Sequence, residues 1–345
     1  MAKRVRVSDD VGVTWNTLSG NTASINFKAD SQDDTVFGQN YKSSQTGAIS
    51  WSISANSVFK GFAGYVAKIL KAGTSTVMTD EPMALVSGKT FRITNTAKRV
   101  INRAVTIVVK DNGTTVSAAN ILSFDYLYGK VTFVSGYTVN GSITITGAYF
   151  PLVSIGCANE FTLTQTSETI DNTCMDTVQA NGGHRTFEPG LKTVALELSG
   201  IYKSTNGFLA SLIARSEVVI EIGPDGSNIA VARGFFKPME TSQDGDVGAL
   251  EQNNIKYELS VPDDDKLVYP FHWDIGAGTT LNLGVQKCIA SWEASSVLKV
   301  AYLPDGVTGV QGDAIITDLS LSGGLESMST FTVDFQGSDA TAAYP

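Results

Sequence analysis

Polar and apolar residues alternate over many short stretches of the chain. Residues 49–54, 193–198 and 331–335 carry an apolar side chain at every second position, as a strand with one buried face does. Three other apolar runs are each followed by a dipeptide that favours the positive φ of a tight hairpin turn: Asn112-Gly113, Asp225-Gly226 and Asp305-Gly306. The pattern therefore predicts a mainly β chain with antiparallel hairpins.

Helical spacing is confined to three short segments. The clearest runs from Phe62 to Leu70, with apolar residues three and four positions apart, and Gly73 provides a stop. Phe208–Ile213 repeats the spacing more briefly, and Lys287–Ser295 carries a weaker form of it. We expect short helices beside a sheet.

These elements recur in the same order along the chain. Residues 51–60 resemble 194–203 at an offset of 143 positions. Thr106–Pro151 parallels Val218–Pro262 at an offset of about 112, and Val297–Gln336 forms a third hairpin copy. Either the chain is internally duplicated, or alternation and glycine turns alone produce the similarity. The repeated order of strand, helix and hairpin favours duplication.

Composition narrows the class of protein. With 42% hydrophobic and 17% charged residues, the chain has enough apolar material for a core and is not a disordered polymer. Its three cysteines form no close-spaced pair, which favours reduced thiols over a disulfide framework. The charged N-terminus runs into polar residues, so no signal peptide is predicted, and no apolar run is long enough for a membrane span.

Candidate chemistry is sparse. His184 and His272 have no second ligand at metal-binding spacing, and Gly88-Lys89-Thr90 lacks the first glycine of a phosphate-binding loop. The acidic runs at 244–246 and 263–265 do not continue as calcium loops. We therefore expect no catalytic, cofactor or metal site, and a protein that is not an enzyme.

Charge has one local feature. The net charge is −9, which disfavours tight binding of nucleic acid, but six basic residues lie between Glu81 and Asp111 with no acid among them. They could form a solvated face, contact nucleic acid, or pair with acids of a neighbouring subunit. Overall acidity makes subunit pairing the better of the two functional interpretations, and its candidate residues are Arg92, Lys98, Arg99 and Arg103.

The recurring pattern resembles a known family. An acidic loop at 29–35 and a polar turn at 44–47 lead into the strand at 49–54. A second strand–loop–strand series runs from Glu160 through Gly190, and strands at 314–320 and 331–337 close the chain. In these features the chain resembles the tail tube proteins of long-tailed bacteriophages.

The resemblance implies a fold and a division of the chain. It implies a mainly β protein with two β-sandwich domains, each with a short flanking helix, plus additional β elements. The first domain would span 1–151 with an insertion around 76–105, the second 152–265, and residues 266–345 would complete or decorate one of them. The first tube unit would join the Trp51 strand either to the Thr106 hairpin or to the Val297 hairpin.

The resemblance also implies a function. Such proteins self-assemble into stacked rings that form the hollow tail tube through which phage DNA passes without tight binding. Expected partners are copies of the chain, in trimeric pseudo-sixfold or hexameric rings, together with tape measure, tail tip and tail terminator proteins. The protein would be assembled in the host cytoplasm and located in the virion tail, with an acidic lumen. The alternative is a β-sandwich virion decoration or carbohydrate-binding module.

Two polar loops are the predicted contacts between rings or subunits. They cover 30–47 and 171–190, and loops of this length in compact domains usually have a function. Their candidate contact residues are Asp33, Asp34, Asp171, Asn172, His184 and Arg185.

Overall fold

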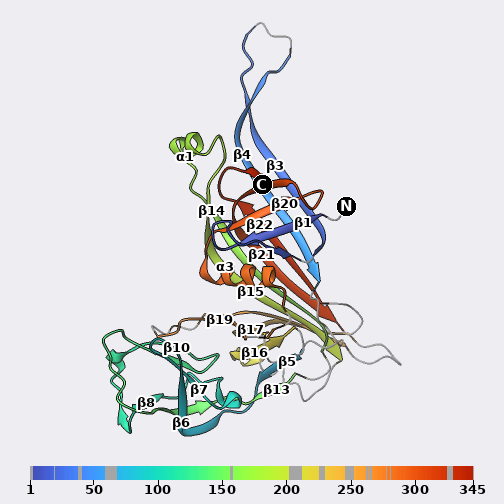
Figure 1. Cartoon of the computed structure of the whole chain (residues 1–345). Coiled ribbons are helices and arrows are strands. Elements are labelled where there is room, and N and C mark those ends of the chain that lie inside the picture. Colours follow the sequence, from blue (N-terminus) through green and yellow to red (C-terminus); the bar gives the residue numbers. More distant parts are fainter. Residues whose placement is uncertain are drawn as a thin grey trace. The chain divides into compact units, whose positions relative to one another are not determined.

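The structure is a computed structural model in which antiparallel strands dominate (Figure 1). It describes residues 3–18, 20–37, 41–58, 68–155, 158–201, 212–224, 230–244, 252–261, 263, 266–276, 278–279, 281–324 and 329–344. The predicted mainly β fold class is confirmed.

The chain forms two compact units, each built from separated segments. Unit 1 comprises Met1–Tyr65, Glu160–Leu196 and Thr280–Pro345, and unit 2 comprises Val66–Asn159 and Glu197–Thr279. This division differs from the predicted boundaries at 151 and 265. The difference arises because strands pair with partners that lie far away in the sequence, which local patterns do not reveal.

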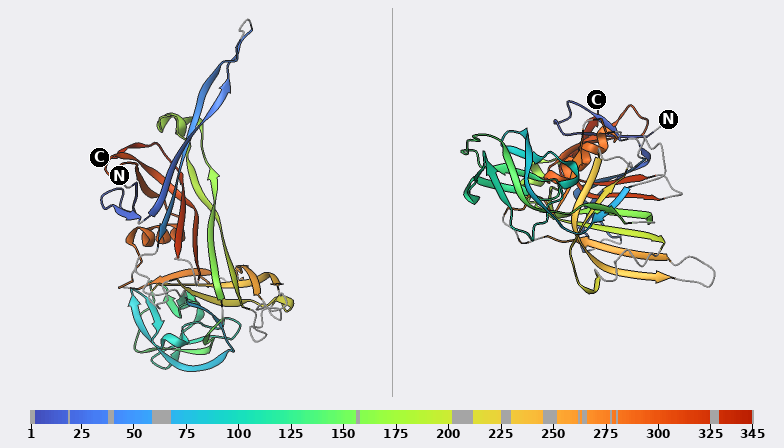
Figure 2. Two further views of the ribbon diagram at one scale, coloured as in Figure 1. Left: turned by 90° about the vertical axis from the view of Figure 1, so that its right-hand side faces the viewer. Right: turned by 90° about the horizontal axis from the view of Figure 1, so that it is seen from below.

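Long strands form the main sheet of unit 1. They lie in the order β3 (Gly20–Asp33), β4 (Ser44–Val58), β22 (Thr330–Gly337), β21 (Gly309–Gly324), β14 (Ala158–Asp171) and β15 (Phe187–Ile201). β4 is paired with β22 over Ser52–Val58, so the Trp51 strand joins the C-terminal hairpin, as one of the two predicted alternatives had it. Beyond Ser52, β3 and β4 continue as a two-stranded hairpin (Figure 2, blue).

Shorter elements of unit 1 cover one face of this sheet. They include β1 (Arg4–Ser8), β2 (Asn16–Leu18), β20 (Leu298–Leu303), β23 (Ala342–Tyr344) and the helix α3 (Leu283–Ala294). α3 packs against β1, β2 and β21 and buries Val285, Ile289 and Trp292. Asn282 caps its first turn by accepting a hydrogen bond from Gly284 N. The helix predicted at Lys287–Ser295 is therefore present and begins earlier than predicted.

Trp51 anchors the core of unit 1. It is 2% exposed, and its indole Nε1 donates to the carbonyl of Asp339 over 2.7 Å. A Cβ at Gly337 would lie 2.1 Å from Trp51 Cε2, and one at Gly312 would lie 2.5 Å from Trp51 Cζ2. The two glycines therefore leave the space that the indole ring occupies.

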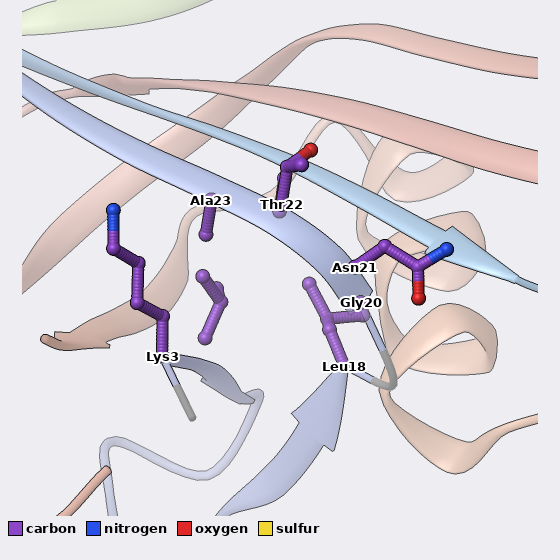
Figure 3. Close-up of a pocket in the computed structure, with 8 residues that line it drawn as sticks. Lys3, Leu18, Gly20, Asn21, Thr22 and Ala23 are labelled. Atoms are coloured by element: carbon purple, nitrogen blue, oxygen red, sulfur yellow. The ribbon is translucent and has the colours of Figure 1, made fainter. Parts of the chain in front are cut away.

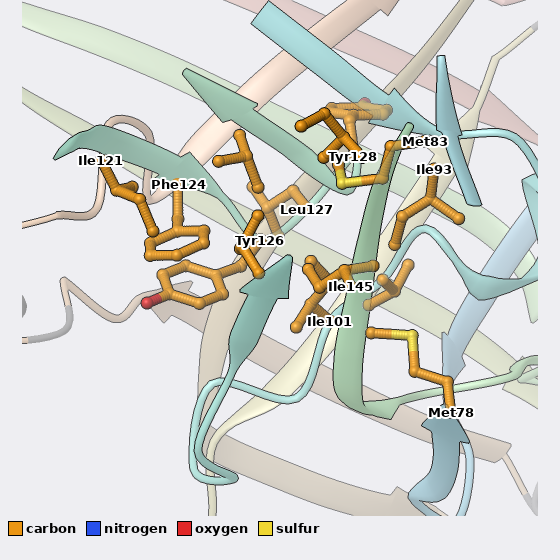
Figure 4. Close-up of a cluster of buried hydrophobic side chains, with 14 of the residues drawn as sticks. Met78, Met83, Ile93, Ile101, Ile121, Phe124, Tyr126, Leu127, Tyr128 and Ile145 are labelled. Carbon is orange, nitrogen blue, oxygen red and sulfur yellow. The ribbon is translucent and has the colours of Figure 1, made fainter. Parts of the chain in front are cut away.

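Unit 2 contains two groups of strands. One comprises β5 (Lys68–Ala72), β13 (Leu152–Ser154), β16 (Val218–Gly223), β17 (Ala230–Asp244), β18 (Gln252–Leu259) and β19 (Phe271–Ile275). The other is a seven-stranded sheet in the order β10 (Ile121–Asp125), β11 (Lys130–Phe133), β7 (Thr90–Ile93), β6 (Thr76–Ser87), β12 (Ile143–Tyr149), β8 (Val108–Asp111) and β9 (Thr114–Thr115). A hydrophobic core that includes Ile93, Ile101, Leu127 and Ile145 fills this unit (Figure 4).

Two predicted helices have different outcomes. The segment predicted as helix from Phe62 ends in strand β5, where Ile69 and Leu70 pair with β16, and residues 59–67 lie outside the described part. Pairing on both sides of β5 outweighs the local helical spacing there. Of Phe208–Ile213, the last two residues are described and are helical.

The strands follow the offset found in the sequence and have matching lengths in the two proposed copies. The bounds of β4 and β15 differ by 143 positions at both ends, which is the offset found in the sequence. Two antiparallel meanders also match: β20–β21–β22 with lengths of 6, 16 and 8 residues, and β16–β17–β18 with 6, 15 and 8. The predicted match of Thr106–Pro151 to Val218–Pro262 is wrong, because the former belongs to the seven-stranded sheet.

Candidate functional site

The main sheet of unit 1 has one face made almost entirely of small polar side chains. Along β22, Phe331, Val333 and Phe335 are buried, and the residues between them point to the other side. The strand registers place two rows of cross-strand neighbours on that other side: Ser24, Ser54, Asp334, Asp318 and Thr166, and then Thr22, Asn56, Thr332, Ser320 and Thr164. We call this surface the polar face.

The polar face carries an excess of negative charge. Continuing the alternation along β14 adds Glu160 and Glu168, and Lys28 joins the face opposite Ser50 on β4. With the two aspartates, the described part of unit 1 presents four carboxylates and one ammonium group there. Unit 1 as a whole has 17 acidic and 10 basic residues, so it holds most of the net charge of −9.

Strand β3 forms one border of this sheet. It is 14 residues long, and in the described structure its ladder partner is β4 alone. Most of its side chains are exposed. β3 therefore presents an edge of backbone donors and acceptors.

The end of the β3–β4 hairpin combines polar turns with exposed apolar groups. Thr35 N donates to Asp33 Oδ1 over 2.9 Å. Hydrogen bonding by the Thr35 side chain, followed by this backbone contact, lowers the pKa of Asp33. Asp34 N donates to the Ser43 carbonyl over 3.1 Å. Phe37 and Tyr41 (87% exposed) project from the hairpin end. Residues 38–40 of the predicted 30–47 loop lie outside the described part.

The connection between β14 and β15 is held against the first hairpin. Arg185 forms ion pairs with Asp171 and Asp30, both at 2.5 Å, so two of the predicted contact residues meet each other. Arg185 N also donates to the Ile49 carbonyl, and Ile49 N donates to the Gly183 carbonyl, each over 2.8 Å. The two predicted loops are thus connected within one chain.

The other predicted contact residues have local partners. His184 Nδ1 lies 3.1 Å from the Asn181 carbonyl, and Asn172 Nδ2 donates to Glu188 over 2.8 Å. The connection between β14 and β15 ends earlier than the predicted 171–190 loop, because β15 begins at Phe187. It contains the short helix α1 (Met175–Ala180). Strand pairing with β14 extends farther than the polar composition suggested.

The cations of the basic run have ion-pair or hydrogen-bond partners within unit 2. Arg92 pairs with Asp274 (3.2 Å), Lys98 with Glu81 (2.5 Å) and Arg103 with Glu217 (2.9 Å). Arg99 Nε donates to the Ile93 carbonyl over 3.0 Å, and burial lowers the pKa of Arg99. Asp274 lies on β19 and Glu217 lies just before β16, both far from the basic run in the sequence, so the sequence alone did not locate these two acids. Pairing of these cations between subunits stays a prediction.

One polar cluster escaped the sequence analysis. Arg233 is 8% exposed and Glu221 is 3% exposed; their side chains form an ion pair of 2.6 Å, and the guanidinium lies over the Tyr128 ring. A charged residue within each of two apolar strands was the available signal. Since a buried charge needs a partner, the pair stabilises the inside of unit 2 and presents no reactive group.

Three further features concern the part of the chain that the structure describes. No group of three metal-ligating side chains occurs among the described residues. No helix in that part of the chain is long and apolar enough to cross a membrane. A cavity of about 270 Å³ in unit 1 is lined by residues that include Lys3, Val5, Leu18 and Asn21 (Figure 3); Lys3 is the titratable group of this lining.

Comparisons with solved structures give matches that include two chains of gene transfer agent particles. One is a chain of the tail of an empty GTA particle with C6 symmetry, with 12% identity and a TM-score of 0.29 over 32% of this chain and 84% of that chain. The other belongs to the virion of a native gene transfer agent particle, with 12% identity and a TM-score of 0.28 over 35% and 88%. Likeness at this level carries no argument about function. No protein-family model and no curated protein matches the chain.

Proposed function

We propose that this chain is a structural protein of a phage-like virion, which polymerises into rings that stack into the hollow tail tube. The observation that carries the proposal is the 14-residue strand β3, which is paired on one side only in the described structure. A long unpaired edge promotes aggregation unless another strand covers it. A second copy of the chain, joined side by side, would cover that edge in every subunit except at an open end of the assembly.

The polar face supports the assignment of an inner wall. Its Ser, Thr and Asn side chains are small and uncharged, and its carboxylates outnumber its ammonium group. Affinity for DNA comes from Lys and Arg that displace counterions from phosphates. A wall of this composition would let DNA pass without holding it, which is the acidic lumen expected from the sequence.

The hairpin ends support stacking of rings. Phe37 and Tyr41 at the first hairpin and Met175 (91% exposed) in the second connection are apolar groups at sites of low packing. The ion pairs of Arg185 connect the two segments, so one chain would present them together to a neighbouring ring. The proposal includes tape measure, tail tip and tail terminator proteins as partners at the tube ends, and no enzymatic activity.

Electron microscopy of the purified protein tests this function. We expect rings or tubes from the natural chain, and their loss in the double variant Phe37→Asp/Tyr41→Asp, because charged groups would replace the apolar contacts between rings. Val307→Asp is the matched control, since Val307 is a 71% exposed apolar residue in another turn of unit 1. Compact particles at all concentrations, with no ring or tube, would instead favour a decoration or carbohydrate-binding module.

A further inference from the structure

Two aspartates face each other across neighbouring strands in the middle of the polar face. Asp318 on β21 and Asp334 on β22 are direct cross-strand partners. Their next neighbours in the row are Thr166 on β14 and Ser54 on β4. Like charges in directly opposite positions destabilise an antiparallel pair, and the row contains no cation that would offset their repulsion.

The surroundings of the pair increase this repulsion. Burial, followed by the charge of Asp334, raises the pKa of Asp318, and a hydrogen bond from Ser320 partly opposes the shift. Asp334 Oδ1 is buried and has no hydrogen-bond partner in the described structure. The other charged groups of this face are Lys28 on β3 and three further acids, Glu160 and Glu168 on β14 and Glu197 on β15.

The internal repeat shows that the strand arrangement does not require two acids. Both meanders carry a bulge in the middle strand, between Ile316 and Asp318 in β21 and between Pro238 and Glu240 in β17. Immediately after the bulge, Glu240 is opposite Lys256, whereas Asp318 is opposite Asp334. The equivalent position therefore holds opposite charges in one copy and like charges in the other.

We propose that Asp318 and Asp334 form a like-charge carboxylate pair, which keeps negative charge on the polar face and lowers the stability of unit 1 at neutral pH. When both groups are ionised, their repulsion opposes the folded state. A proton bound by Asp318 removes one of the two charges and so relieves the repulsion. The destabilisation is therefore present above the raised pKa of Asp318 and is relieved as the pH falls through it.

The role of this charge rests on the proposed function. On a tube wall the pair would recur in every subunit at one height. A DNA phosphate passing that height would meet the carboxylates of Asp318 and Asp334. The equivalent position in the β16–β17–β18 meander instead carries Lys256. The pair therefore contributes to preventing the wall from binding DNA.

Hydrogen exchange of the β21 and β22 amides in the purified full-length chain tests the pair itself. At neutral pH we expect Asp318→Asn and Asp334→Asn each to slow exchange by roughly two- to fivefold, and the double variant to slow it no further, because either change removes the same repulsion. Asp334→Lys, which copies the Glu240–Lys256 arrangement, should slow it most. The gains of the single Asn variants should shrink in acid. Additive effects of the two Asn changes, or faster exchange in both, would overturn the proposal.

Asp313→Asn is the matched control on the same strand. Asp313 pairs with Lys299 over 3.0 Å, so its loss should leave exchange unchanged or make it faster at neutral pH. A slowing in Asp313→Asn equal to that in Asp334→Asn would show a general response to lower charge, and would overturn the specific role of the pair.

A second measurement concerns the wall. Assembled Asp334→Lys tubes should retain a fluorescent DNA duplex at low salt, and tubes of the natural chain should not. Equal retention by both would overturn the role of the pair in excluding DNA. If the natural chain forms no tubes, the proposed function fails, whereas the exchange experiment on the pair keeps its meaning.

Discussion

At the residue scale, the structure depends on a few close contacts that no local pattern reveals. The alternation in residues 49–54 predicts that Trp51 is buried, and it is. The glycines that accommodate its ring, Gly312 and Gly337, lie more than 250 positions away, and glycine in a strand has no apolar signature. The same holds for the basic run, whose Arg92 and Arg103 pair with acids at positions 274 and 217.

We expect Gly337→Ala to destabilise unit 1 by about 1–3 kcal/mol, the usual effect of overpacking a core. The added methyl group would lie 2.1 Å from Trp51 Cε2, so the ring would have to move and lose its hydrogen bond to Asp339. Chemical denaturation measures the change. Gly136→Ala is the control, because a Cβ there meets nothing within 4 Å; equal midpoints for the two variants would contradict the role of Gly337.

At the element scale, long strands with regular alternation were predictable and short connections were not. The matching bounds of β4 and β15 follow the offset seen in the sequence, and α3 was expected near its position. The predicted 171–190 loop is too long, because Glu188–Gly190 have no apolar pattern but belong to strand β15. The ion pair between Arg185 and Asp30 joins residues 155 positions apart, so it was beyond pattern analysis.

Arg185→Gln should loosen the connection between β14 and β15. We expect exchange of the Ile49 and Arg185 amides to become about threefold faster, since two partly exposed ion pairs are lost. Hydrogen bonding by Thr173, followed by Arg185, lowers the pKa of Asp171; its contribution is thus present above the ordinary Asp range and is lost as the pH falls through the lowered value.

Lys287→Gln is the control for this variant, because Lys287 forms a comparable ion pair of 2.6 Å with Asp9 elsewhere in unit 1. Loss of the Lys287–Asp9 ion pair should leave the hydrogen-exchange rate of the Ile49 amide unchanged. If the two variants had the same effect on Ile49, the connection would not depend on Arg185 in particular.

At the scale of the whole molecule, the two copies of hairpin and meander suggest that one chain supplies two tube units. A ring of six units would then need three chains, with pseudo-sixfold symmetry. We expect native mass spectrometry of isolated rings to give close to three times the chain mass of 36.6 kDa. A ring of six chains, or ring images with six identical subunits, would contradict the duplication as the basis of the symmetry.

The pairing of β4 with β22 sets the stage of translation at which the sheet of unit 1 can be completed. Ser44–Val58 is synthesised long before Thr330–Gly337, and at translation rates of about 5–20 residues per second the interval is on the order of tens of seconds. Throughout that interval the first hairpin lacks its neighbour on the ribosome, and unit 1 cannot close. A chain that stops before β22 never completes the sheet, so in the proposed tube a subunit becomes competent to join only after β22 has been translated.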